Sequence, residues 1–284
     1  MSGLPMSRSK GASSPRRRLR AALVAGLAAV GGCKKVEPAP KELDRLFPWF
    51  FTGIEDRSDE ELAEGLRNLH EQARKLGLGE THDGSISRLE AADLEGMGIE
   101  RDPAKAAGVY LLNPLACGLG QLDRILSYKD QDELYEGVYD RYDREFTSER
   151  ERYLNREVPE LTWTVNYEAT ILGKSYESDI DGMLRAVPAL DSEQSPYGEF
   201  LIARAYIPRP ARFDSGNVRL DQDYQIEIYY NAPGAGLLHA YGLWREADFG
   251  GGITSENEGS QRLLLNELAA WDEDTAALCE AGQP

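Results

Sequence analysis

The sequence predicts an α+β protein in which an antiparallel β-sheet is followed by a long C-terminal helix. Residues 161–171 carry apolar side chains at every second position, namely Leu161, Trp163, Val165, Tyr167, Ala169 and Ile171. This period of two is typical of a strand with one buried face. Near the C-terminus the apolar side chains recur instead with helical spacing, at Leu264, Leu268, Trp271, Thr275 and Leu278. That spacing predicts a helix that buries one side.

The N-terminal part of the chain is predicted to be helical. Ser58 and Glu61 have the spacing of a capping box and precede an apolar stripe that ends at Gly77, which predicts a helix over 58–76. A shorter helix is expected around 86–94. Residues 43–103 are therefore interpreted as a small helical cap segment. Four aromatic side chains surround Pro48, at Phe47, Trp49, Phe50 and Phe51. They either anchor the chain at a membrane interface or pack onto the domain, and packing is the favoured interpretation.

Residues 104–284 are predicted to form one antiparallel α+β domain. A strand is expected over 106–112, after which Asn113 and Pro114 suit the cap and first residue of a helix that reaches about Leu126. The aromatics of 135–146 recur with helical spacing and a helix is the favoured interpretation, although they also suit a strand. Further strands are expected at 174–186, 199–207, 223–230 and 236–248, with turn residues between them. Ser255 and Glu258 are predicted to cap the last helix.

The first 32 residues predict an export signal. Arginines at 16, 17, 18 and 20 precede an uncharged stretch over 21–32, which is shorter than the roughly 20 residues that span a membrane. The stretch ends in Val30-Gly31-Gly32-Cys33, which resembles the lipobox of bacterial lipoproteins. The resemblance implies that residues 1–32 are a cleaved signal peptide and that Cys33 receives a diacylglyceryl group. Residues 33–42, with two prolines, are predicted to be a lipidated tether, and Lys34 favours the outer membrane over the inner one.

Charge and cysteine content narrow the class of partners. Removal of the signal leaves 26 basic against 49 acidic residues, a net charge of −23. Nucleic acid is therefore not expected as a partner, because phosphate binding needs a basic face. With Cys33 assigned to the lipid, Cys117 and Cys279 remain. In an oxidising compartment two thiols are more often bridged than free, so a disulfide is predicted, with two separate buried thiols as the alternative.

The motifs of common catalytic and metal sites are absent from the sequence. It has no nucleophile elbow, no phosphate loop and no complete dinucleotide fingerprint. The three histidines lack metal-ligand spacing, and Asp179–Gly182 matches only the start of a calcium loop. No cofactor, metal or catalytic residue is therefore predicted, an enzyme is not favoured, and no protein partner can be named.

A ligand pocket is one interpretation of the aromatic and polar side chains on the strands. The candidate lining residues are Trp163, Tyr167, Ile228, Tyr230, His239, Trp244 and Arg245. Alternation places His239 and Arg245 on one face of the 236–248 strand, with Glu246 on the other. The favoured alternative is an ordinary core, in which Arg245 makes a cross-strand ion pair and His239 is hydrogen-bonded.

The order of elements resembles the helix-grip fold of the START-like and polyketide-cyclase-like families over residues 104–280. Val109 to Leu112, running into Asn113-Pro114, is similar to the opening of those domains, and Trp244 to Cys279 is similar to their last strand and gripping helix. The resemblance implies a curved sheet and a terminal helix that enclose a cavity for a lipid or other apolar small molecule. The expected protein is thus a membrane-anchored lipoprotein of the bacterial cell envelope, periplasmic or surface-exposed. The alternative is a structural or protein-interaction lipoprotein with a filled core.

Overall fold

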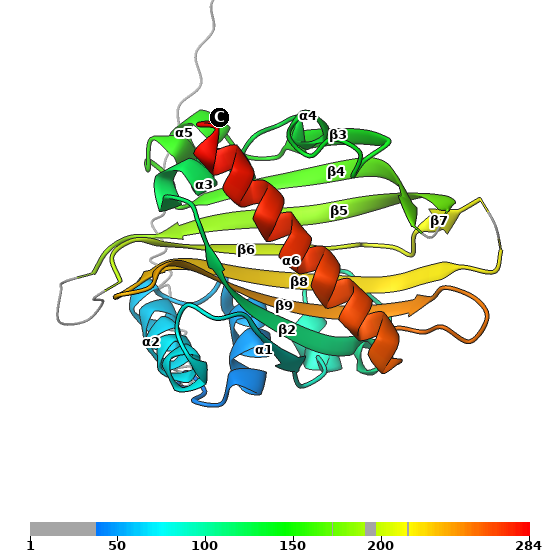
Figure 1. Ribbon diagram of the computed structural model, residues 1–284, viewed down its shortest axis with the longest axis horizontal. Coiled ribbons are helices and arrows are strands. Elements are labelled where there is room, and N and C mark those ends of the chain that lie inside the picture. Colours follow the sequence, from blue (N-terminus) through cyan, green and yellow to red (C-terminus); the bar gives the residue numbers. More distant parts are fainter. Residues whose placement is uncertain (1–37, 172, 191–196, 215) are drawn as a thin grey trace, which may run out of the picture. The chain divides into compact units, whose positions relative to one another are not determined.

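A nine-stranded antiparallel sheet organises the described part of the chain (Figure 1). The computed structural model describes residues 38–171, 173–190, 197–214 and 216–284, so the predicted signal peptide and Cys33 lie outside the described residues. The strand order is β1-β2-β9-β8-β6-β5-β4-β3, with β7 paired to β5. The strands are β1 (His82–Ser85), β2 (Ala107–Leu115), β3 (Arg141–Phe146), β4 (Glu160–Ile171), β5 (Lys174–Val187), β6 (Phe200–Tyr206), β7 (Arg212–Phe213), β8 (Arg219–Ala232) and β9 (Gly236–Asp248).

Helices cover both faces of this sheet. The long C-terminal helix α6 (Glu258–Glu280) runs diagonally across one face, as the red helix in Figure 1 shows, and α3 (Leu119–Leu126), α4 (Gln131–Leu134) and α5 (Arg150–Leu154) lie near its C-terminal end. The helices α1 (Leu43–Gly53) and α2 (Asp59–Leu76) pack on the opposite face, followed by the 3-10 turns η1 (Ala91–Leu94) and η2 (Pro103–Lys105). A curved antiparallel sheet with a long terminal helix across it is the predicted α+β, helix-grip arrangement.

The largest apolar core lies between the sheet and α1 and α2. Phe47, Phe50 and Phe51 have no exposed surface and pack in one cluster with residues of β8 and β9. The packing interpretation of the aromatic segment is therefore confirmed. The predicted boundary at residue 103 is not a domain boundary, since residues 38–284 form one compact unit and β1 adds a strand to the sheet.

The chain before α1 is attached to the domain. The side-chain amide of Asn68 on α2 donates hydrogen bonds to the carbonyl oxygens of Ala39 and Pro40, at 3.0 and 2.9 Å. Ala39 is buried in the core. The predicted tether over 33–42 is therefore too long at its C-terminal end, because prolines prevent regular structure without preventing side chains from holding the backbone.

The period-two patterns predicted most strands well, and β9 has the predicted bounds. The predicted helix from Asn113 to about Leu126 is present as α3, but its predicted start is wrong, since Asn113 and Pro114 belong to β2 and the helix begins at Leu119. The neighbouring strand β1 pairs with β2 only as far as Leu112, so the missing N–H of Pro114 lies where no partner strand requires it. The predicted helix over 135–146 is also wrong, because Tyr142 and Arg144 alternate as buried residues of β3. The N-cap of α6 is Asn257, while the Ser255 hydroxyl accepts a hydrogen bond from the Ala247 N–H.

Candidate functional site

The C-terminal half of α6 is fastened to the body by several contacts. A disulfide joins Cys117 and Cys279, whose Cα atoms lie 5.4 Å apart. The Gln121 side chain donates a hydrogen bond of 2.8 Å to the Cys279 carbonyl oxygen. Tyr135 stacks on Trp271 with ring centroids 3.8 Å apart, and its hydroxyl lies 2.9 Å from that of the buried Thr275. This end of the helix therefore has covalent, aromatic and polar connections to the domain.

A buried polar cluster adds a further connection between α6 and the sheet. His239 Nδ1 lies 2.8 Å from an Asp272 carboxylate oxygen, and His239 Nε2 lies 3.3 Å from Glu227. The Asn113 side chain donates to the second Asp272 oxygen at 2.8 Å. Burial lowers the pKa of His239, but the adjacent Asp272 and Glu227 carboxylates outweigh it and raise that pKa to about 9. The imidazolium ion thus holds Asp272 of α6 against β8 and β9.

The N-terminal half of α6 is held more loosely and borders a pocket. No residue of α6 before Asp272 is fully buried. Between this half, the end of β4 and the loop that follows β9 there is a cavity of about 420 Å³. Its lining residues are Ile171, Arg245, Phe249, Gly252, Ile253, Ser255, Asn257, Gly259, Ser260, Gln261, Leu263, Leu264 and Glu267. The volume falls in the range of roughly 300–1,000 Å³ that is usual for small-molecule sites.

Arg245 supplies the deepest charge of this pocket. Its Nε donates a 2.5 Å hydrogen bond to Asp223, a buried residue of β8. Burial lowers the pKa of Arg245, but the Asp223 carboxylate outweighs this and holds that pKa above its ordinary value. Among the described residues, the hydroxyl of Ser260 is a buried lining atom that has no hydrogen-bond partner. The pocket therefore combines apolar side chains with a few polar groups.

The seven predicted lining residues do not lie in one pocket but on both faces of the sheet. Arg245 lines the pocket, whereas His239 and Tyr167 lie on the same face of the sheet outside the lining. Trp163 is also on this face and packs in the core that includes residues of α3 and α5, with the Arg144 guanidinium 4.8 Å from its ring centroid. The other three lie on the opposite face and pack with α1 and α2, namely Ile228, Tyr230 and Trp244.

The placement of Ile228, Tyr230 and Trp244 is a correction to the predicted pocket. Neighbouring residues of a strand point to opposite faces, so Trp244 and Arg245 cannot line one pocket on the same side of the sheet. The favoured sequence interpretation of the polar pair agrees with the structure, since Arg245 makes a cross-strand ion pair and His239 is hydrogen-bonded.

Apart from Arg245, none of the residues that line the pocket was predicted as a ligand contact. Phe249, Ile253 and Leu263 belong to the loop after β9 and to the first turns of α6. Ile253 and Leu263 are each 49% exposed. One signal in the sequence could have indicated this part of the pocket. Ile253 directly follows three glycines, in a connecting loop that would ordinarily be polar.

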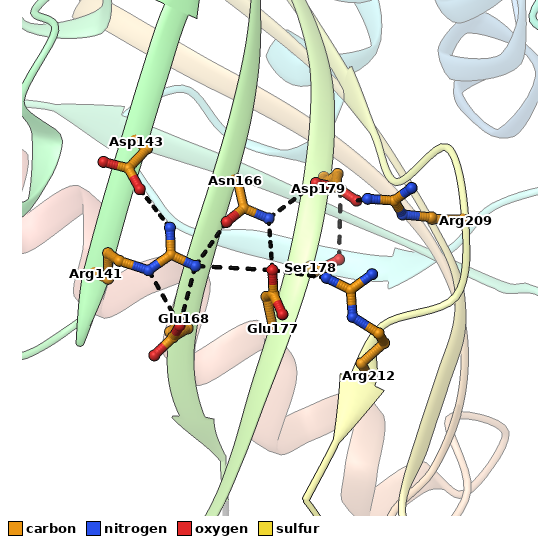
Figure 2. A network of polar contacts seen from close by, with 9 residues as sticks. All are labelled: Arg141, Asp143, Asn166, Glu168, Glu177, Ser178, Asp179, Arg209 and Arg212. Carbon is orange, nitrogen blue, oxygen red and sulfur yellow. Dashed lines mark hydrogen bonds and ion pairs between the residues drawn. The ribbon is translucent and has the colours of Figure 1, made fainter.

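A second group of charges lies on β3, β4 and β5, away from this pocket (Figure 2). Arg141 forms ion pairs with Asp143, Glu168 and Glu177, while Arg209 pairs with Asp179. Figure 2 shows these side chains joined into one network through Asn166. Asp179–Gly182 is therefore part of strand β5 and not of a calcium loop. Over residues 38–284, as far as they are described, no group of acidic, histidine or cysteine side chains is arranged to hold a metal ion.

Comparison with known proteins identifies no family. No protein-family model matches the chain, and no curated protein matches it. Among solved structures, that of Ara h 8.0201 is similar at 7% identity with a TM-score of 0.35, covering 62% of this chain and 99% of that one. Human STARD10 is similar at 11% identity with a TM-score of 0.36, covering 68% and 82%.

Proposed function

We propose that this protein is a membrane-anchored lipoprotein of the bacterial cell envelope that binds an apolar or amphipathic small molecule in the pocket beside α6. The observation that carries the proposal is the 420 Å³ cavity with its apolar lining. Of the four large hydrophobic side chains that are exposed in the described residues, two border this cavity, Ile253 and Leu263. Apolar side chains that gather at the rim of a pocket are typical of a binding site.

Ligand entry would use the looser half of α6. Partly buried leucines at 264, 265 and 268 pack on Val109, Leu111, Tyr241 and Leu243 through apolar contacts. Gly250, Gly251 and Gly252 precede the helix with positive φ angles of 81°, 65° and 84°, which glycine adopts at low cost. We expect this half to move away from the sheet while the disulfide-linked end stays in place.

Attachment to the membrane would come from Cys33. Within the described residues, no helix has the length and apolar character needed to cross a bilayer. The lipobox resemblance supports a lipid anchor, and the Cys117–Cys279 disulfide fits an exported protein, since disulfides persist in oxidising compartments. The outer membrane is the proposed location.

Mass spectrometry of organic extracts from the purified protein tests ligand binding. We expect a retained small molecule in the extract of the wild-type protein and its loss from the Leu264→Trp variant, whose larger side chain occupies the pocket. Leu76→Trp is the matched control, because Leu76 is exposed at the end of α2 and borders no part of this cavity. An extract without ligand, or one unchanged by Leu264→Trp, would contradict the proposal.

The alternative is a structural or interaction lipoprotein. One observation favours it: Val109, Leu111, Tyr241 and Leu243 fill the space under the middle of α6, so the cavity lies at one end of the helix. In that case the exposed Ile253 and Leu263 would be covered by another protein, and the purified protein would carry no small molecule.

A further inference from the structure

We infer that the pocket selects uncharged amphiphiles with a hydroxyl head group over carboxylates of the same chain length. This inference rests on the proposed function and specifies the class of ligand. It comes from the charges of the lining, in which Arg245 and Glu267 are the only residues with formal charges among those described.

The positive charge of Arg245 is already compensated by the protein. Asp223 lies 2.5 Å away, and its side chain is only 4% exposed. Because this carboxylate is shielded from water, its effect on Arg245 is stronger than that of a surface charge. An anionic ligand would therefore meet a neutral pair and not a free cation.

Glu267 adds a negative charge to the same lining. Glu267 and Arg245 line the same cavity, so a ligand in it meets both charges. In the described structure Arg245 forms its ion pair with Asp223 and not with Glu267. A carboxylate head would bring a third negative charge beside Asp223 and Glu267.

A hydroxyl head group can form hydrogen bonds with both Arg245 and Glu267. Arginine can only donate hydrogen bonds and an ionised glutamate can only accept them, whereas a hydroxyl does both. The head would accept from a terminal nitrogen of Arg245 and donate to Glu267. A carboxylate lacks the proton that Glu267 requires. The alkyl chain would lie against Phe249, Ile253 and Leu264.

Competition between decanol and decanoate tests the inference. The full chain is loaded with Nile red, an uncharged apolar dye, and each competitor is titrated near pH 7. We expect decanol to displace the dye at a concentration about tenfold lower than decanoate does. In the Glu267→Gln variant the two displacing concentrations should be closer to each other. The substitution removes a negative charge from the lining and should therefore strengthen decanoate binding.

Glu273→Gln is the matched control. Glu273 lies on the same helix and is exposed, so its substitution changes the net charge equally, but it does not line the pocket. We expect it to leave the ratio unchanged. Equal or tighter binding of decanoate by the wild-type protein would overturn the inference, as would equal effects of the two substitutions. Failure of the protein to bind Nile red at all would instead contradict the proposed function.

Discussion

His239 shows how one buried residue connects two elements. It is 3% exposed and lies between Asp272 of α6 and Glu227 of β8. A buried carboxylate or imidazolium ion is costly without partners, and here the partners come from both sides of the sheet–helix interface. The Tyr229 hydroxyl donates to Glu227 and Asn113 donates to Asp272, so each carboxylate also accepts a hydrogen bond from a neutral side chain. Residues far apart in the sequence thus form one polar cluster.

Stability should decline at alkaline pH because of His239. Its folded-state pKa is about 9, above the ordinary value of 6.5, so the protonated form is favoured by folding. The stabilisation is complete below about pH 6.5 and is lost as the pH rises through about 9. Urea unfolding of the protein at a series of pH values between about 6 and 10 measures this decline.

The Asp272→Asn variant tests whether the His239 ion pair causes this alkaline decline in stability. Removing one partner of a buried ion pair costs about 3–5 kcal/mol, so the variant should have a lower free energy of unfolding at neutral pH. It should also show a smaller alkaline decline, since His239 loses its closest carboxylate. An unchanged alkaline decline in the variant would assign the pH dependence to another group.

At the scale of elements, α6 has two unlike halves. From Trp271 onward it has the Tyr135 contacts, the His239 cluster and the disulfide, while its first half rests on the sheet through partly buried leucines. The sequence predicted the apolar stripe of this helix and the pairing partners Cys117 and Cys279. It did not predict the difference between the halves, because Asn113, Gln121 and Tyr135 contact the helix from distant segments.

Amide hydrogen exchange should distinguish the two halves of α6. We expect the backbone amides of 261–268 to exchange faster than those of 272–280, because opening of the first half breaks fewer contacts. In a Cys117→Ser, Cys279→Ser double variant, protection of 272–280 should fall and the free energy of unfolding should drop by about 2–4 kcal/mol. Uniform protection along the whole helix would contradict the proposed route of ligand entry.

At the scale of the molecule, the alternation of apolar residues predicted the strands, but it did not predict which helices pack on each face of the sheet. Trp244 and Arg245 were both assigned to a pocket because aromatic and charged side chains suit one, yet adjacent residues of β9 must face opposite sides. Which face receives α1 and which receives α6 depends on non-local packing. The cavity itself is formed by the end of β4, the loop after β9 and the start of α6, which no local pattern brings together.

Membrane attachment is a separate prediction for the whole molecule. Cys33→Ala should leave the precursor without lipid and move the protein from the detergent phase to the aqueous phase in a Triton X-114 partition. Each buried methylene of an acyl chain contributes about 0.8 kcal/mol, so loss of the chains should abolish stable binding. Because Phe47, Phe50 and Phe51 are buried in the core, they provide no second anchor. A variant that stays in the detergent phase would refute the lipid anchor.

Binding of Nile red by the full-length protein is the most direct test of the pocket. The fluorescence of the dye is measured while wild-type protein, Leu264→Trp or Leu76→Trp is added, after circular dichroism has shown that the three proteins share the same fold. The account predicts saturable binding at one site for the wild-type protein and Leu76→Trp, and binding at least about tenfold weaker for Leu264→Trp. Equal binding by all three proteins, or no binding by the wild-type protein, would contradict it.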